Sequence, residues 1–188
     1  EAFDKTAKLL GLGYPGGPAV ERLAMQGDPM AVPLPRPLKG SSEPHFSFAG
    51  LKSAVLRAVE SGAHKPADIA AGFQQAAVEC LIDRLELALE RAGPFPALVV
   101  AGGVAANKTV RSALEGFAAK HAMRFTAPPL ALCTDNAAMI AWAGCERLAA
   151  ENWAAGAGFT GDPLDFLARP RWPLDPAAEA VRGAGAKA

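Results

Sequence analysis

A chain of 188 residues, 51% of them hydrophobic and 20% charged, can bury the core of one large domain or two small ones. Its 19 basic and 19 acidic residues leave no net charge, so nucleic acid would have to be bound by a local patch rather than by a basic surface overall. No apolar segment reaches the roughly 18 residues of a membrane span, and three cysteines without C-x-x-C spacing favour a reducing, cytoplasmic compartment over a disulfide framework.

The first half of the chain is predicted to be mainly helical. A helix is expected over residues 2–12, ending at the glycine-rich turn GYPGGP, and a short one over 19–27. Residues 28–44 form a loop, because four closely spaced prolines exclude regular structure. Further helices are expected at 50–60 and, with apolar residues at helical spacing, at 67–91.

The second half alternates strands and helices. The apolar run 97–101 predicts a buried strand that leads into a helix near 107–121. MRFTAP (123–128) predicts a second strand, and a helix capped near Thr134 or Asp135 follows it. This order is typical of an α/β protein with parallel strand pairing.

The stretch AGGVAANKT (101–109) differs from a phosphate-binding P-loop at one position. Gly102, Lys108 and Thr109 fit the pattern G-x-x-x-x-G-K-[ST], but Asn107 stands where the second glycine is needed. We therefore favour a strand ending in Gly102-Gly103, where the missing side chains let a nucleotide approach N–H groups at a helix N-terminus. Asn107 would then offer an amide to the ligand, or would cap the helix.

Two other motifs are ambiguous by themselves. Asp135 in CTDN is either a helix cap or, less often, a metal ligand. Asp4 in FDK and Gly17 in YPGGP would ordinarily be a solvated acid and a turn residue.

Taken together and in this order, the motifs are similar to those of one family. The chain resembles the carboxy-terminal half of the tRNA N6-adenosine threonylcarbamoyltransferases, the TsaD family, once labelled glycoprotein endopeptidases. The resemblance extends from Glu1 to about Leu174 and is carried by EAFDKTAKLLGLGYPGGP, HFSFAGLKSAV, ADIAAGFQQAAVECL, LVVAGGVAANKTVRSAL, CTDNAAMIAWAG and RPRWPL.

The resemblance implies an actin-like ATPase (ASKHA, ribonuclease H-like) fold, of which this chain is the carboxy-terminal lobe with an inserted helical region. Residues 1–174 would be part of the catalytic domain, and 175–188 a flexible tail. The family transfers a threonylcarbamoyl group from threonylcarbamoyl-AMP to N6 of the adenosine beside the anticodon in tRNAs reading ANN codons. Implied partners are tRNA, a TsaB-like paralogue and a TsaE-like ATPase, with no membrane.

The resemblance also assigns site residues. Substrate-binding positions of the family match Asp4, Gly17, Glu21 and Asn107, and a nucleoside contact is expected at Gly102 and Gly103. Asp135 matches a metal ligand, for one divalent ion that would be iron, with zinc as the alternative. No residue of this half is implied to be catalytic.

Some features depart from the family pattern. His45 and Ala49 replace the Asp and Ser of the family's DFSFSGLKT, and Ser53 replaces its Thr. The family's H-x-x-x-H metal pair and Ser-Gly-Gly loop do not occur in the chain, and it starts in mid-pattern at Glu1. We therefore expect a fragment that is inactive alone. The alternatives are a non-catalytic nucleotide-binding or scaffold module of the modification complex, and an actin-fold phosphotransferase.

Overall fold

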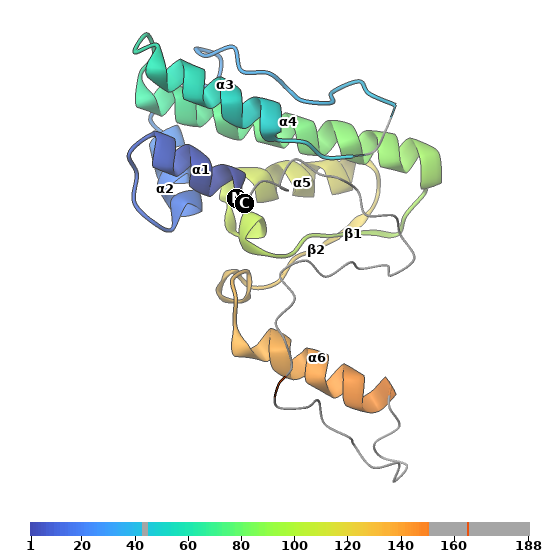
Figure 1. Cartoon of the computed structure of the whole chain (residues 1–188). Coiled ribbons are helices and arrows are strands. Elements are labelled where there is room, and N and C mark those ends of the chain that lie inside the picture. Colours follow the sequence, from blue (N-terminus) through green and yellow to red (C-terminus); the bar gives the residue numbers. More distant parts are fainter. Residues whose placement is uncertain (43–44, 151–164, 166–188) are drawn as a thin grey trace. The chain divides into compact units, whose positions relative to one another are not determined.

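The computed structural model describes residues 1–42, 45–150 and 165, and the chain divides into two compact units, residues 1–135 and 136–188. The first unit begins with helices and continues with a small parallel sheet (Figure 1). Its elements are α1 (Ala2–Leu9), α2 (Gly16–Ala24), α3 (Ala49–Glu60), α4 (Pro66–Ala92), β1 (Ala97–Val99), the 3-10 helix η1 (Gly103–Ala106), α5 (Lys108–Lys120), β2 (Arg124–Thr126) and the 3-10 helix η2 (Leu130–Leu132).

Helix α1 is shorter than its periodicity predicts. It ends at Leu9 because Gly11 takes a left-handed φ of +69°. The amide of Leu12 donates to the carbonyl of Ala7, and that of Gly11 to the carbonyl of Lys8. This pair of bonds is a Schellman motif, which satisfies the last carbonyls of the helix and turns the chain away.

The other helices lie close to their predicted positions. Helix α2 begins at Gly16 rather than at residue 19, so the two glycines of YPGGP belong to its first turn. Helices α3 and α4 agree with the predictions within one residue at each end, and α4 has Pro66 in its first turn, where proline is tolerated. The described part of the predicted proline-rich loop, residues 28–42, contains no helix or strand, as expected.

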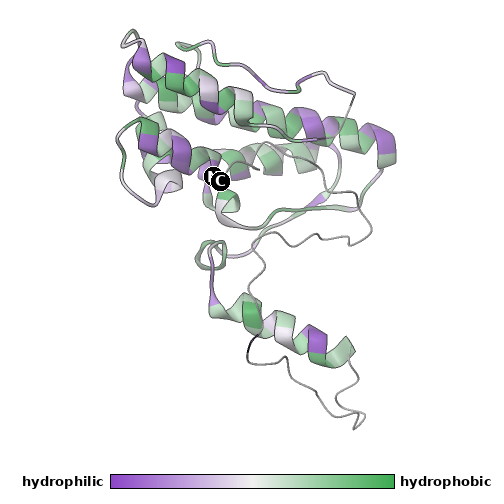
Figure 2. Cartoon of the chain, viewed as in Figure 1, coloured by the Kyte–Doolittle hydropathy of each residue, from purple (hydrophilic) through white to green (hydrophobic). Residues whose placement is uncertain are grey.

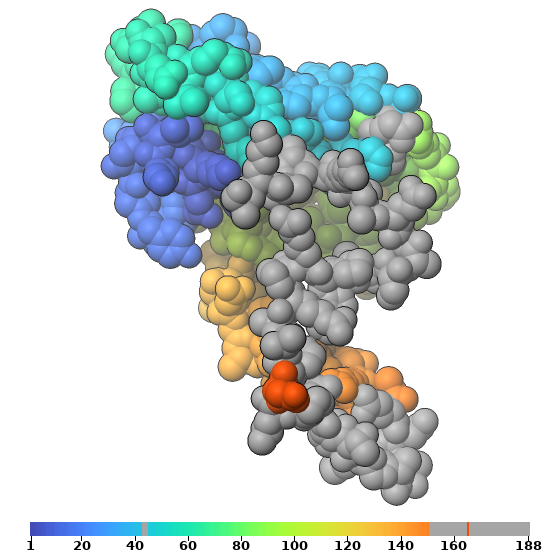
Figure 3. Space-filling model, in the orientation of Figure 1, coloured from blue at the N-terminus to red at the C-terminus, as the bar shows by residue number. Residues whose placement is uncertain are grey.

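Helix α4 is the central element of the first unit. It contacts α2, α3 and α5, and in Figure 1 it runs beside α3. The space-filling view shows the blue atoms of the N-terminal helices below those of α3, and α1 contacts both α2 and α3 (Figure 3). The core of this helical part is apolar, and its largest fully buried side chains include Val20, Leu51, Val55, Ile69 and Phe73.

A second core lies between α4, α5 and the sheet. Strands β1 and β2 pair in parallel, with Leu98 opposite Phe125, which confirms the predicted pairing. Both side chains pack against a buried cluster of Val78 from α4 and Val110 and Leu114 from α5.

The prediction that the first strand is buried was wrong. The next residue after Leu98 in β1, Val99, is 70% exposed. Successive strand residues point to opposite faces, and within the described part of the chain helices cover one face of this sheet. The alternation therefore leaves Leu98 half-buried and Val99 exposed.

In the second unit the structure describes helix α6 (Ala137–Ala150), which contains no buried residue. Figure 2 shows apolar colouring over most of it. Its cap is Asn136, one residue beyond the predicted Thr134 or Asp135, because the amide of Met139 donates to Oδ1 of Asn136, at 3.1 Å. None of the helices described here has the length and apolarity needed to cross a bilayer. The stretch RPRWPL and the predicted tail, 175–188, lie outside the described residues.

Candidate nucleotide-binding site

The predicted site residues of the second core follow the carboxyl ends of the two parallel strands. The turn of Gly102-Gly103 comes after β1, and the segment 127–135 comes after β2. A Cβ placed on Gly103 would lie 3.8 Å from the carbonyl oxygen of Cys133. The two loops therefore adjoin, and Asp135 follows two residues later.

The two glycines of this turn differ in what they require. Gly102 has φ +82° and ψ 179°, a combination that is essentially restricted to glycine. Gly103 has an ordinary φ and begins η1, and an added Cβ would meet only the Cys133 oxygen. The backbone conformation at position 102 requires glycine. At Gly103 the absence of a side chain instead leaves the surface of the turn uncovered.

Asn107 is buried and caps helix α5, as one of the two interpretations predicts. It is 7% exposed, and its Oδ1 accepts a hydrogen bond from the amide of Val110 at 2.9 Å. Its Nδ2 donates to Oε1 of Gln74 on α4 at 2.8 Å. Its φ of −68° is not the left-handed conformation that a glycine of a P-loop can adopt, so the turn does not wrap around a phosphate there.

Glu21, which lies on α2, also contacts the N-terminus of α5. Its Oε1 accepts a hydrogen bond from the amide of Lys108, the first residue of α5, at 2.7 Å. A carboxylate is favourable here, because the N-terminus of a helix carries free N–H groups and a partial positive charge. Glu21 on α2 and Asn107 thus converge on the first turn of α5, although 86 residues separate them in the sequence.

Asp4 and Gly17 lie on either side of the contact between α1 and α2. Oδ1 of Asp4 accepts a hydrogen bond from the amide of Gly16 at 3.1 Å. A Cβ on Gly16 would lie only 2.7 Å from the Ala7 Cβ and from the Asp4 Cα. A Cβ on Gly17 would meet nothing within 4 Å. Gly16 therefore allows the helices to pack, and Gly17 has open space around the position of a side chain.

Asp135 is exposed. Since Asn136 caps α6, the carboxylate of Asp135 is not required for that purpose. It remains chemically suited to a hard divalent cation. Among the residues that the structure describes, no group of three or more His, Cys, Asp and Glu side chains could hold a metal ion, so Asp135 would need ligands from elsewhere.

Arg111 holds the two loops of the site together, a role that the sequence did not indicate. Its Nε donates to the carbonyl of Ala105 in η1 at 3.0 Å, and its Nη2 donates to the carbonyl of Pro128 at 2.8 Å. Nη2 also lies 3.7 Å from Sγ of Cys133, which is buried. One side chain of α5 therefore ties the turn after β1 to the segment that leads to Asp135.

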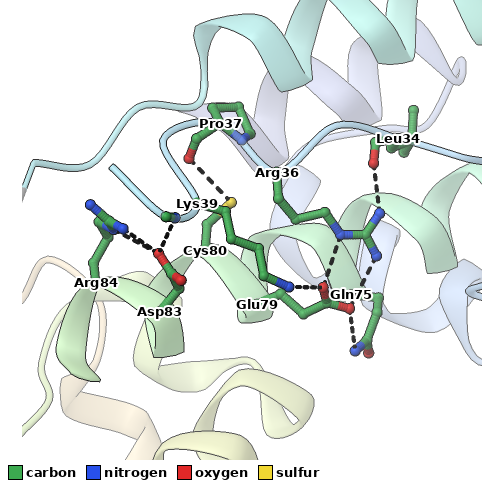
Figure 4. Close-up of polar contacts among 10 residues, drawn as sticks. Leu34, Arg36, Pro37, Lys39, Gln75, Glu79, Cys80, Asp83 and Arg84 are labelled. Carbon is green, nitrogen blue, oxygen red and sulfur yellow. Dashed lines mark hydrogen bonds and ion pairs between the residues drawn. The ribbon is translucent and has the colours of Figure 1, made fainter. Parts of the chain in front are cut away.

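A second polar cluster, away from this turn, fastens the proline-rich loop along α4 (Figure 4). Arg36 makes a two-pronged ion pair with Glu79, with both N–O distances 3.0 Å, and Lys39 approaches the same carboxylate. Hydrogen bonding from Arg36 lowers the pKa of Glu79 to about 2. Further along α4, Sγ of Cys80 contacts the carbonyl of Pro37, and burial raises the pKa of that thiol.

Ser53, one of the altered loop positions, and a groove beside the proline-rich loop are two further features of this unit. Oγ of Ser53 bonds the carbonyl of Ala49 within α3. A groove of about 670 Å³ lies between the proline-rich loop and α3, lined in part by Arg57 and His64, and none of the predicted site residues lines it.

Comparison with known proteins agrees with the motifs. The model of the family described as TsaD, tRNA N6-adenosine threonylcarbamoyltransferase, matches residues 1–142. Proteins named tRNA N6-adenosine threonylcarbamoyltransferase from Erythrobacter litoralis and Sphingopyxis alaskensis are 74% and 70% identical over 188 residues, which are 100% of this chain and 52% of each relative. One from Zymomonas mobilis is 60% identical over 192 residues, with 51% of its length covered. The chain thus spans about half the length of these relatives.

Proposed function

Since this chain belongs to the tRNA N6-adenosine threonylcarbamoyltransferase family, we propose that it supplies half of an enzyme that modifies tRNA. The reaction would transfer a threonylcarbamoyl group from threonylcarbamoyl-AMP to N6 of the adenosine beside the anticodon in tRNAs reading ANN codons. The N6 nitrogen forms a bond to the carbamoyl carbon, the bond from that carbon to the phosphate oxygen breaks, N6 loses one proton, and AMP leaves.

One observation supports the adenylate site above the others. Glu21 and Asn107, both assigned from the family resemblance, bond the first turn of α5 beside the Gly102-Gly103 turn. Helix N-termini and bare glycine backbone are the features that bind nucleotides closely. We propose that the adenylate lies along this turn, with Asp4 and Gly17 contributing from the α1–α2 contact.

We assign Asp135 as the contribution of this half to a metal site. Its carboxylate fits a divalent ion, iron or zinc, because it is exposed and is not used as a helix cap. Such an ion would supply positive charge that polarises the acyl phosphate. The remaining ligands would come from the other half of the protein. We assign no catalytic acid or base to the described residues.

Membership of the family is also the basis of our proposals for the fold and the partners. We propose that β1, α5 and β2 belong to an actin-like lobe and that the helices α1–α4 are its inserted helical region. We further propose that the enzyme works in the cytoplasm, where tRNA is used, with a TsaB-like paralogue and a TsaE-like ATPase.

The test uses a polypeptide in which this chain is joined to the remaining half found in its relatives. Gly103→Val should abolish binding of AMP and formation of threonylcarbamoyladenosine, measured by calorimetry and by mass spectrometry of tRNA nucleosides. Gly17→Ala should weaken both. Gly116→Ala is the matched control, because this exposed helical glycine also has open space for a Cβ. Normal modification by Gly103→Val would contradict the site, and AMP binding without modification in the unaltered polypeptide would favour a scaffold module.

A further inference from the structure

We propose that Gln74 and Thr109 are positioning residues for Asn107, an inference that rests on the adenylate site proposed above. Gln74 lies on α4 and accepts from Nδ2 of Asn107 at 2.8 Å. Its own Nε2 donates to Oγ1 of Thr109 on α5 at 3.1 Å. Asn107, Gln74 and Thr109 therefore form one continuous chain of hydrogen bonds that begins at the amide of Val110.

The direction of every bond in this chain follows from one backbone group. The Val110 amide can only donate, so it requires Oδ1 of Asn107 on its side. Nδ2 of Asn107 must then face Gln74, which has to present Oε1 and turn Nε2 toward Thr109. The threonine hydroxyl accepts this last bond. A rotation of either amide by half a turn would place two donors or two acceptors against each other.

Burial makes this orientation strict. Gln74 is 7% exposed and is preceded in α4 by the fully buried Phe73. A buried amide is costly unless both its ends are bonded, and an apolar side chain would fill this position without that cost. The neighbouring Gln75 serves a different purpose, since it bonds Glu79 near the surface. The two glutamines are thus a matched pair in which only Gln74 touches the site.

The consequence is a fixed donor and acceptor pattern at Asn107. After its bonds to Val110 and Gln74, the amide retains one N–H and one lone pair by its valence. A ligand then meets these two groups in one order and not in the reverse order. Gln74 and Thr109 act through Asn107 and need not touch the ligand.

The test uses the joined polypeptide labelled with ¹⁵N in its asparagines, with AMP as the probe. Gln74→Leu and Thr109→Val should both shift the side-chain amide signal of Asn107, speed its hydrogen exchange and weaken AMP binding about tenfold, the usual effect of one unsatisfied buried group. Thr109→Ser, which keeps the hydroxyl, should restore all three readouts. Gln75→Leu should leave all three unchanged. Thr109 is exposed, so its variants keep the test valid even if Gln74→Leu fails to fold.

The outcomes separate this inference from the site itself. If Asn107→Ala weakens AMP binding but Thr109→Val leaves the affinity and the Asn107 signal unchanged, the adenylate site stands and the positioning role is wrong. If Asn107→Ala leaves AMP affinity unchanged, the proposed adenylate site is wrong, and the positioning role is overturned with it.

Discussion

The neighbouring glycines of YPGGP should respond in opposite ways to the same substitution. In Gly16→Ala the new methyl group would lie 2.7 Å from the Cβ of Ala7 and from the Cα of Asp4, and 2.8 Å from the Asp4 carboxylate. Backbone and a buried alanine cannot move aside cheaply, so α1 and α2 must separate. In Gly17→Ala the methyl group meets nothing within 4 Å.

The magnitudes follow from three effects. Overpacking a well-packed contact costs about 1–3 kcal/mol, and weakening the bond from the Gly16 amide to Asp4 adds about 0.5–1.5 kcal/mol. Alanine in place of glycine in a helix recovers up to about 1 kcal/mol. We therefore expect Gly16→Ala to lower the free energy of unfolding by about 1–3 kcal/mol, and Gly17→Ala to leave it unchanged or raise it by up to about 1 kcal/mol.

Urea and thermal unfolding followed by circular dichroism would measure both variants. At about 2–4 °C per kcal/mol for a protein of this size, Gly16→Ala should melt several degrees below Gly17→Ala. Equal stability of the two variants, within about 0.5 kcal/mol, would refute the close α1–α2 contact on which Asp4 and Gly17 are placed.

Three further changes test other parts of the structure. The folded-state pKa of Glu79, about 2, lies below its ordinary value of 4.5, so its ion pair stabilises the protein above pH 4.5 and is lost as the pH falls toward 2. The shift corresponds to at most about 3 kcal/mol, and partial exposure reduces it to about 1–2 kcal/mol. Glu79→Gln should therefore lower the free energy of unfolding at pH 7, with a smaller difference from the unaltered chain at pH 3 in urea titrations. Gly102→Ala should lower the free energy of unfolding, measured by thermal unfolding, by about 1–3 kcal/mol, because an alanine backbone is strained at φ +82°. Gly103→Ala should be nearly neutral, and equal costs would count against the turn geometry. Asp135→Asn should leave the melting temperature unchanged, because Asn136 caps α6, yet reduce metal content in the joined polypeptide. A lower melting temperature of this variant would indicate that Asp135 has a structural role instead.

Local signals in the sequence were sufficient for most elements. A Gly-Gly pair after an apolar run placed the turn between β1 and α5, and prolines kept 28–42 free of helix and strand. Such signals work because turns, caps and helix starts depend on φ preferences and free N–H groups within a few residues. The same locality explains the errors. Three adjacent residues, Thr134, Asp135 and Asn136, can all cap a helix, and the pattern could not choose among them.

The sequence by itself therefore determined the order of the helices and strands and the family, and it predicted which residues bind a nucleotide. Only the tertiary structure decided which of them meet. It brought Glu21 from α2 to the amide of Lys108 and placed Gln74 against Asn107. These contacts join residues 33 to 87 positions apart in the sequence. They depend on how α2 and α5 pack against α4, which no local preference encodes. The exposure of Val99 has the same origin, since a strand is buried only where another layer covers its face.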